Sequence, residues 1–149
     1  MRKIIDKKQL IEYCYTMKDF SCAIKNDNSK GNGVEISQFR ELAIACKSCD
    51  TFEEAQLLVK YKIATDHNYT SWGFDIGDGK TIGKAVLDKI SRIRSDYDDD
   101  AVLNALSLFF GYLFRSAVIW KSGIYSRESD NSISRSMRTR CEDSGFYEI

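Results

Sequence analysis

Apolar side chains recur at intervals of three and four residues along most of the chain, which is the period of one buried face of an α-helix. This pattern predicts five helices, over residues 4–24, 37–47, 52–65, 81–94 and 101–121. Charged and polar side chains fill the other faces of the first four segments. The fifth segment is apolar on most faces, so we expect it to be the central helix of the fold.

Local signals mark where three of these helices begin. Thr51 followed by Glu54 is typical of a capping box, in which each side chain accepts a hydrogen bond from an otherwise unpaired backbone N–H. Ser37 is the expected cap of the second helix, because a serine oxygen accepts an N–H of the first turn. The acidic residues at positions 98–100 favour the positive end of the fifth helix dipole.

Two segments between the helices have loop chemistry. Residues 25–33 gather asparagine, serine and glycine, which tolerate turn conformations. Residues 66–80 contain three glycines and scattered aromatic residues, which favours a long loop folded on its own side chains. We expect Trp72 and Phe74 to hold this loop against the body of the protein.

The composition favours one helical domain. The chain has 149 residues, of which 43% are apolar and 30% charged, and this is enough material for a hydrophobic core. It contains no proline, which favours helices joined by glycine and asparagine turns. We therefore expect a single-domain all-α bundle of about five helices in residues 1–122, followed by a polar serine- and arginine-containing arm in residues 123–149.

Hydropathy and cysteine usage indicate the compartment. No stretch of about 18 uncharged apolar residues is present, and residues 1–10 lack the apolar core of a signal peptide. We expect a soluble, unsecreted protein that does not bind membranes. The five cysteines are odd in number, and most lie in apolar periodic segments, where a free thiol packs as a small hydrophobic group. A cytoplasmic location fits these thiols best.

Three short motifs resemble functional sites but lack essential parts. Cys46 and Cys49 form a CxxC pair, but zinc needs four ligands and His67 is the single histidine. Residues 73–81 end in Gly-Lys-Thr, yet their spacing is not that of a phosphate loop. Residues 96–101 lack the glycine of a calcium loop. We therefore expect no metal, no cofactor and no enzymatic activity.

The chain has 22 basic and 22 acidic residues, so its net charge gives no reason to expect nucleic acid. The charges are nevertheless grouped. Basic residues gather at Arg2, Lys3, Lys7 and Lys8, at Lys60 and Lys62, and at Lys80, Lys84, Lys89 and Arg92; acidic residues gather at Glu53, Glu54 and in positions 96–100. This grouping allows a basic face that contacts phosphate and an acidic pole that docks a neighbour. Ordinary solvated helix faces are the alternative.

Three strings in the predicted helices resemble a known family. They are Glu-Ile-Ser-Gln-Phe-Arg at residues 35–40, Val-Lys-Tyr-Lys-Ile-Ala-Thr-Asp at residues 59–66 and Phe-Phe-Gly-Tyr-Leu-Phe-Arg at residues 109–115. They are similar to the Ser-Gln-x-Arg helix start, the Lys/Tyr/Ala-rich helix and the closing aromatic helix of the small all-helical subunit of type III CRISPR effector complexes. The final helix lacks that family's Tyr-His-Lys-like ending, and the serine-rich arm is foreign to it.

This resemblance implies a non-catalytic subunit of a ribonucleoprotein complex in antiviral defence. Such a subunit stacks in several copies and contacts neighbouring protein subunits, with its basic face near the guide RNA and the target strand. The nucleic-acid-binding residues carried over are Arg40, Lys60, Lys62 and Arg115. A guanidinium or ammonium group on an exposed helix face suits phosphate, whereas Arg115 lies in an apolar helix and must pair or extend outward.

A second interpretation comes from another class of protein. The chain is then a small helical protein-binding module, such as an inhibitor or an immunity-type protein. Its acidic pole in residues 96–100 and its aromatic loop around Trp72 would dock a protein partner. Salt-dependent binding of RNA separates the two interpretations, because neutralised phosphates release counterions.

Overall fold

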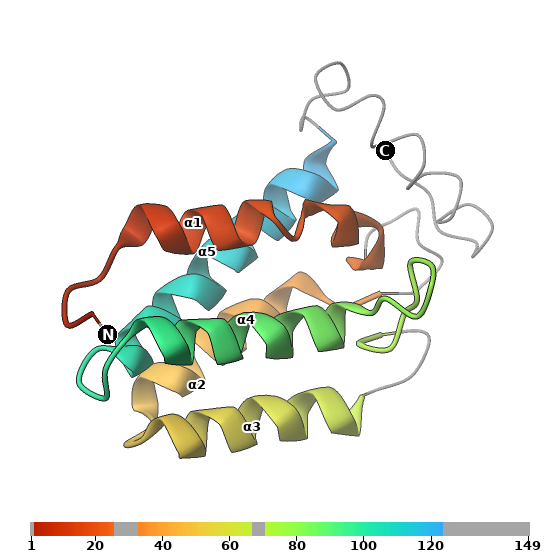
Figure 1. Cartoon of the computed structure of the whole chain (residues 1–149). Helices are drawn as coiled ribbons and strands as arrows, with labels where there is room; N and C mark the ends of the chain where they lie inside the picture. Colours follow the sequence, from red (N-terminus) through yellow and green to blue (C-terminus); the bar gives the residue numbers. More distant parts are fainter. Residues whose placement is uncertain (1, 26–32, 67–70, 124–149) are drawn as a thin grey trace.

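The computed structural model describes residues 2–25, 33–66 and 71–123, which form an all-α bundle (Figure 1). Its helices are α1 (Lys7–Tyr15), the 3₁₀ helix η1 (Lys18–Ala23), α2 (Ile36–Ser48), α3 (Phe52–Thr65), α4 (Ile82–Asp96) and α5 (Val102–Ser122). The predicted fold class is confirmed, and α3 covers the predicted residues. The expected arm lies outside the described residues, apart from Gly123.

The central helix is α5, as its apolar pattern predicts. It packs mainly against α2 and α1 and more lightly against α4, η1 and α3. Its buried residues are Val102, Ala105, Leu106, Phe109, Phe110, Leu113 and Ala117. The Ser107 hydroxyl donates a hydrogen bond of 2.8 Å to the carbonyl of Ala43, which joins α5 to α2. Within the described part of the chain, α5 alone has the length and composition of a membrane span, a property that core helices of soluble proteins share.

The single helix predicted over residues 4–24 is wrong, because α1 ends at Tyr15 and the chain continues as η1. At the end of the predicted segment, Cys22, Ala23 and Ile24 are three consecutive buried residues, a pattern that departs from the single buried face of an α-helix. Ile24 instead forms a parallel bridge with Val34. Cys22 is disulfide-bonded, so the expectation of a free thiol is wrong at this position.

The predicted helix starts have different outcomes. The capping box of α3 is confirmed, because the Thr51 hydroxyl accepts the N–H of Glu54 at 3.1 Å. The Glu54 carboxylate accepts the N–H of Asp50 at 2.7 Å, one residue before the expected donor. The predicted Ser37 cap is wrong: α2 already begins at Ile36, so Ser37 lies within the first turn and makes no cap.

The aromatic residues of the loop before α4 are buried, as expected. Trp72 is fully buried and meets Phe39 of α2 edge-on, with ring centroids 5.7 Å apart. Phe74 is also buried. Gly83 permits this packing, because a Cβ at this position would lie 3.1 Å from the carbonyl oxygen of Trp72. The loop is therefore held against the bundle by its own side chains.

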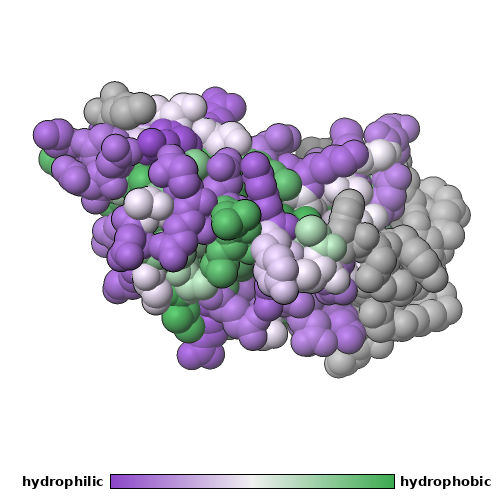
Figure 2. Space-filling view, turned by 90° about the horizontal axis from the view of Figure 1, so that it is seen from below, coloured by the Kyte–Doolittle hydropathy of each residue, from purple (hydrophilic) through white to green (hydrophobic). Residues whose placement is uncertain are grey.

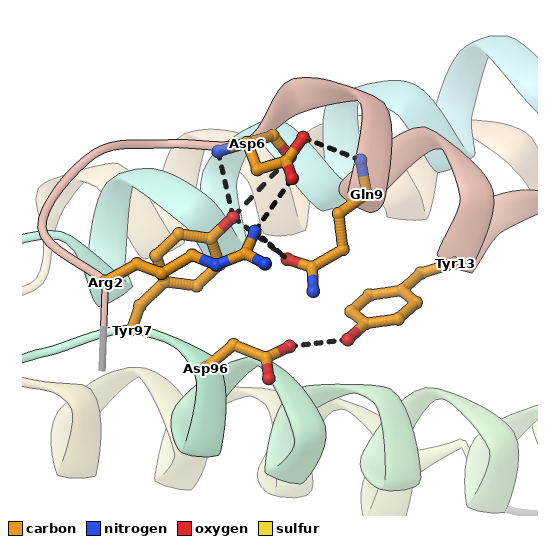
Figure 3. Close-up of polar contacts among 6 residues, drawn as sticks. All are labelled: Arg2, Asp6, Gln9, Tyr13, Asp96 and Tyr97. Atoms are coloured by element: carbon orange, nitrogen blue, oxygen red, sulfur yellow. Dashed lines mark hydrogen bonds and ion pairs between the residues drawn. The ribbon is translucent and has the colours of Figure 1, made fainter.

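A polar cluster around Tyr97 joins the start of α1 to the end of α4 (Figure 3). The buried Tyr97 hydroxyl accepts the N–H of Asp6 at 3.0 Å and donates to the Gln9 side chain at 3.1 Å. The Arg2 guanidinium pairs with the Asp6 carboxylate at 2.8 Å. The Arg2 backbone N–H donates to the carbonyl of Asp96 at 2.8 Å. We call these residues, Arg2, Asp6, Gln9 and Tyr97, the Tyr97 cluster.

We expect the substitution Tyr97→Phe to lower the free energy of unfolding by about 1–2 kcal/mol, because it leaves the Asp6 N–H and the Gln9 side chain without their shared partner. Urea unfolding measures this loss. Tyr15→Phe is the matched control, because it removes the same hydroxyl from a side chain that is 57% exposed. Equal losses in the two variants would contradict a structural role for the Tyr97 cluster.

We expect the described free cysteines to differ in reactivity. Burial raises the pKa of Cys14 and Cys46 to about 12, and it also raises the pKa of the half-buried Cys49. In the native protein at about pH 8, iodoacetamide should modify Cys49 before Cys14 and Cys46, because a reagent must reach a thiolate. Peptide mapping by mass spectrometry, with and without urea, checks the order.

Burial of the Cys14 and Cys46 thiols also makes the free energy of unfolding fall at alkaline pH. A thiol in the unfolded chain ionises near pH ~8.5, whereas Cys14 and Cys46 in the folded chain ionise near a pKa of about 12. Their contribution to stability is therefore present below the unfolded pKa and is lost as the pH rises toward the folded pKa. We expect Cys14→Ala combined with Cys46→Ala to flatten this alkaline decline in urea unfolding. An unchanged decline would contradict the assignment.

Candidate functional site

A hollow of about 460 Å³ lies between the segment that leaves the end of α1 and continues as η1 and, opposite it, the turn before α4 with the first half of α4. Met17 and Phe20 form one wall, and Lys80, Lys84 and Lys89 form the other. In Figure 1, α1 and α4 run side by side, and the turn that precedes α4 lies at the end where α1 passes into η1. We call this feature the α1–α4 hollow.

The turn before α4 fixes the position of Lys80. Asp75 and Thr81 form an antiparallel bridge, and the N–H of Ile76 donates to the carbonyl of Lys80 at 2.9 Å. The Gly77 N–H donates to the Asp75 carboxylate at 2.7 Å, and the Lys80 N–H donates to the Gly77 carbonyl at 3.1 Å. This segment is thus a tight hairpin in which the amides of Ile76, Gly77 and Lys80 have partners within the turn.

The start of α4 also keeps its backbone donors for internal partners. The Gly83 N–H donates to the carbonyl of Trp72 at 3.1 Å, and the Lys84 N–H donates to the Thr81 hydroxyl at 3.3 Å. Binding of an anion in the α1–α4 hollow therefore depends on its lysine side chains. The hollow is lined by three lysines and two aspartates, Asp19 and Asp88, so its walls carry a small positive excess.

An aromatic ring continues this basic surface along α4. The Lys89 ammonium lies 5.4 Å from the centroid of the Tyr13 ring, and the Arg92 guanidinium lies 5.8 Å from the same centroid. Such cation–π contacts stabilise the cations at the surface. Burial lowers the pKa of Lys89, and the positive charge of Arg92 lowers it further. The Tyr13 hydroxyl donates to Asp96, which fixes the ring between α1 and α4 (Figure 3).

The residues carried over from the family resemblance lie on other helices. Arg40 is exposed on α2, and Lys60 is exposed on α3. Lys62 is half-buried and forms an ion pair of 3.2 Å with Glu41 of α2. Arg115 is exposed on α5, with its guanidinium 5.9 Å from the Tyr112 ring centroid. None of the four lines the α1–α4 hollow.

The acidic pole and the CxxC pair have structural partners. The Asp98 carboxylate accepts the N–H of Ala101 at 3.2 Å, in the turn before α5, while the first turn of α5 itself contains no acidic residue. Asp99 pairs with Arg94 at 2.6 Å. Cys46 is buried, and Cys49 is half-buried. Among the residues that the structure describes, no group of three or more His, Cys, Asp and Glu side chains is placed to hold a metal ion. His67 lies outside the described residues.

Sequence reasoning grouped the cations of α4 but missed their aromatic neighbours. Tyr13 and Phe20 lie far from α4 in the sequence, so the spacing of residues within either segment does not predict that they face α4. A partial signal exists in α4 itself, where Lys84, Asp88 and Arg92 follow one another at four-residue spacing and therefore share a face. Comparison of the chain with protein-family models, curated proteins and solved structures finds no match.

Proposed function

We propose that this chain is a non-catalytic subunit that contacts the backbone of a nucleic acid through the α1–α4 hollow and the adjoining cations of α4. The observation that carries the proposal is the juxtaposition of Lys89 and Arg92 with the Tyr13 ring, beside the lysines of the hollow. Cations of this kind bind phosphate without reading sequence, and the half-buried Tyr13 ring stands beside them, as aromatic side chains do in single-strand binding surfaces.

The narrower form of the proposal is the small helical subunit of a type III CRISPR effector complex. It is supported by the resemblance of the three helical strings and places guide or target RNA against Arg40, Lys60, Lys62 and Arg115. Of these, Lys60 is exposed without an ion pair among the described contacts, whereas Lys62 already neutralises Glu41. The α4 surface and the α2–α3 surface are therefore competing places for the same backbone.

The second candidate, a protein-binding module, loses part of its support. This candidate function requires Trp72 of the aromatic loop to contact a partner, but the Trp72 side chain is fully buried against Phe39. In the acidic pole, Asp98 accepts the N–H of Ala101 in the turn before α5, and Asp99 pairs with Arg94. These side chains already make contacts within the fold, which favours the basic surface as the place where a partner binds.

We expect wild-type protein to bind fluorescently labelled single-stranded RNA with an affinity that falls as salt rises. Lys84→Glu combined with Arg92→Glu should weaken binding and reduce the slope of log affinity against log salt by about 1.4, since each lost contact with single strands contributes about 0.7. Fluorescence anisotropy measures both quantities. Lys60→Glu combined with Lys62→Glu is the matched control, with the same change in net charge.

The outcomes separate the possibilities. Loss of binding in the α4 variant, with the α2–α3 variant near wild type, supports the α1–α4 hollow. The reverse result moves the site to the surface that the family resemblance implies. Absence of salt-dependent RNA binding, together with a stable nucleic-acid-free complex with another protein, would overturn the proposal in favour of the protein-binding module. Urea unfolding of each variant ensures that lost binding is not lost folding.

A further inference from the structure

The outer face of α3 carries three exposed large apolar side chains although α3 already buries its opposite face. Phe52, Ala55, Val59 and Ile63 point into the bundle, yet Leu57 is 70% exposed and Tyr61 is 67% exposed. Leu58 is 37% exposed beside them. Figure 2 views the bundle from the side of α3 and shows hydrophobic residues gathered at the middle of a hydrophilic face. A peripheral helix of a monomer normally turns polar residues outward.

Ile44 of α2 extends this surface. Its side chain is 61% exposed. The ion pair between Glu41 and Lys62 holds α2 against α3, and Ile44 and Leu58 each lie about one helical turn from it, toward the connection between the two helices. We call Ile44, Leu57, Leu58 and Tyr61 the α3 patch. Contiguous exposed apolar patches of this kind mark sites of interaction.

The charges that flank Leu57 are arranged with opposite signs on its two sides. Glu53 stands four residues before Leu57, and its side chain is 74% exposed. Lys60 stands three residues after Leu57 and is exposed. A two-fold rotation about an axis near Leu57 brings Glu53 of one copy against Lys60 of the other. The same rotation sets the two α3 helices antiparallel, which also opposes their dipoles favourably.

We propose that the α3 patch is the contact surface for a second copy of this chain, which pairs through a two-fold axis near Leu57. Charge complementarity favours a second copy as the partner. When two α3 patches face each other, their apolar centres meet, and Glu53 of each copy lies opposite Lys60 of the other. Such a pair uses the same face of each copy, so the assembly stops at a dimer. Head-to-tail stacking uses two different faces, so further copies can be added. The inference does not depend on nucleic-acid binding in the α1–α4 hollow, although pairing covers Lys60, which the narrower form of the proposed function places against RNA.

The first experiment measures the mass of the full chain by sedimentation equilibrium without nucleic acid. We expect the mass to rise with concentration from the 17.1 kDa monomer toward twice that value. Leu57→Asp should raise the dissociation constant of the dimer by about tenfold or more, because it places a charge at the centre of the interface. Ile4→Asp is the matched control, since Ile4 is 83% exposed outside the α3 patch.

The second experiment exchanges the charges. Lys60→Glu and Glu53→Lys should each weaken the dimer, since each sets like charges against one another across the axis. The double variant should restore pairing, because Lys at position 53 then meets Glu at position 60 of the other copy. Glu53 also lies 3.9 Å from Arg94 of its own chain, so urea unfolding accompanies each measurement to separate folding from pairing.

Several results would overturn the inference. A wild-type chain that stays monomeric at all concentrations excludes pairing, and a dimer that Leu57→Asp leaves intact uses another surface. A mass that grows beyond two copies indicates head-to-tail stacking. A charge-exchanged double variant that stays as weak as the single variants rules out the two-fold register near Leu57, even when a dimer forms.

Discussion

The structure depends on the need to cover α5, which is apolar around most of its circumference. Truncating one buried phenylalanine such as Phe109 or Phe110 to alanine typically costs about 3–5 kcal/mol, so α5 cannot leave its core faces in water. α2 and α1 supply most of the cover. One side of α1 packs against α5. From another side of α1, the Tyr13 side chain contacts Asp96 and Lys89 of α4. The seam between α1 and α4, and the hollow in it, therefore follow from how α5 is buried.

Polar contacts set the geometry of that seam after burial has brought its helices together. At one end, the Tyr97 cluster ties the start of α1 to the end of α4. Further along, the Tyr13 hydroxyl holds Asp96 while the Tyr13 ring lies beside Lys89 and Arg92. At the other end, α1 gives way to η1 and the seam opens into the hollow. The geometry of a site between two helices thus depends on the contacts that hold one helix against the other.

The sequence predicted what local patterns determine. The capping box at Thr51 and the apolar period located α3, and the grouping of lysines in α4 was visible. The end of α1 at Tyr15 was not predicted, and neither was the bridge between Ile24 and Val34, which is a tertiary contact. The same limit applies to the candidate site. No spacing within α4 shows that Tyr13 faces it, and no spacing within α3 shows that Lys62 pairs with Glu41.

Charge placement distinguishes α3 from α4 in a way that bears on function. In α3, acidic residues begin the helix and Lys62 lies in its last turn, an order that the helix dipole itself favours. Helix stability therefore accounts for Glu53, Glu54 and Lys62, but not for Lys60, which lies before the last turn. In α4, no acidic residue lies in the first turn, and Lys80 and Lys84 stand at the positive end of the dipole, where each exposed cation costs about 0.3–1 kcal/mol. Helix stability does not explain this arrangement, whereas an anion bound in the α1–α4 hollow would.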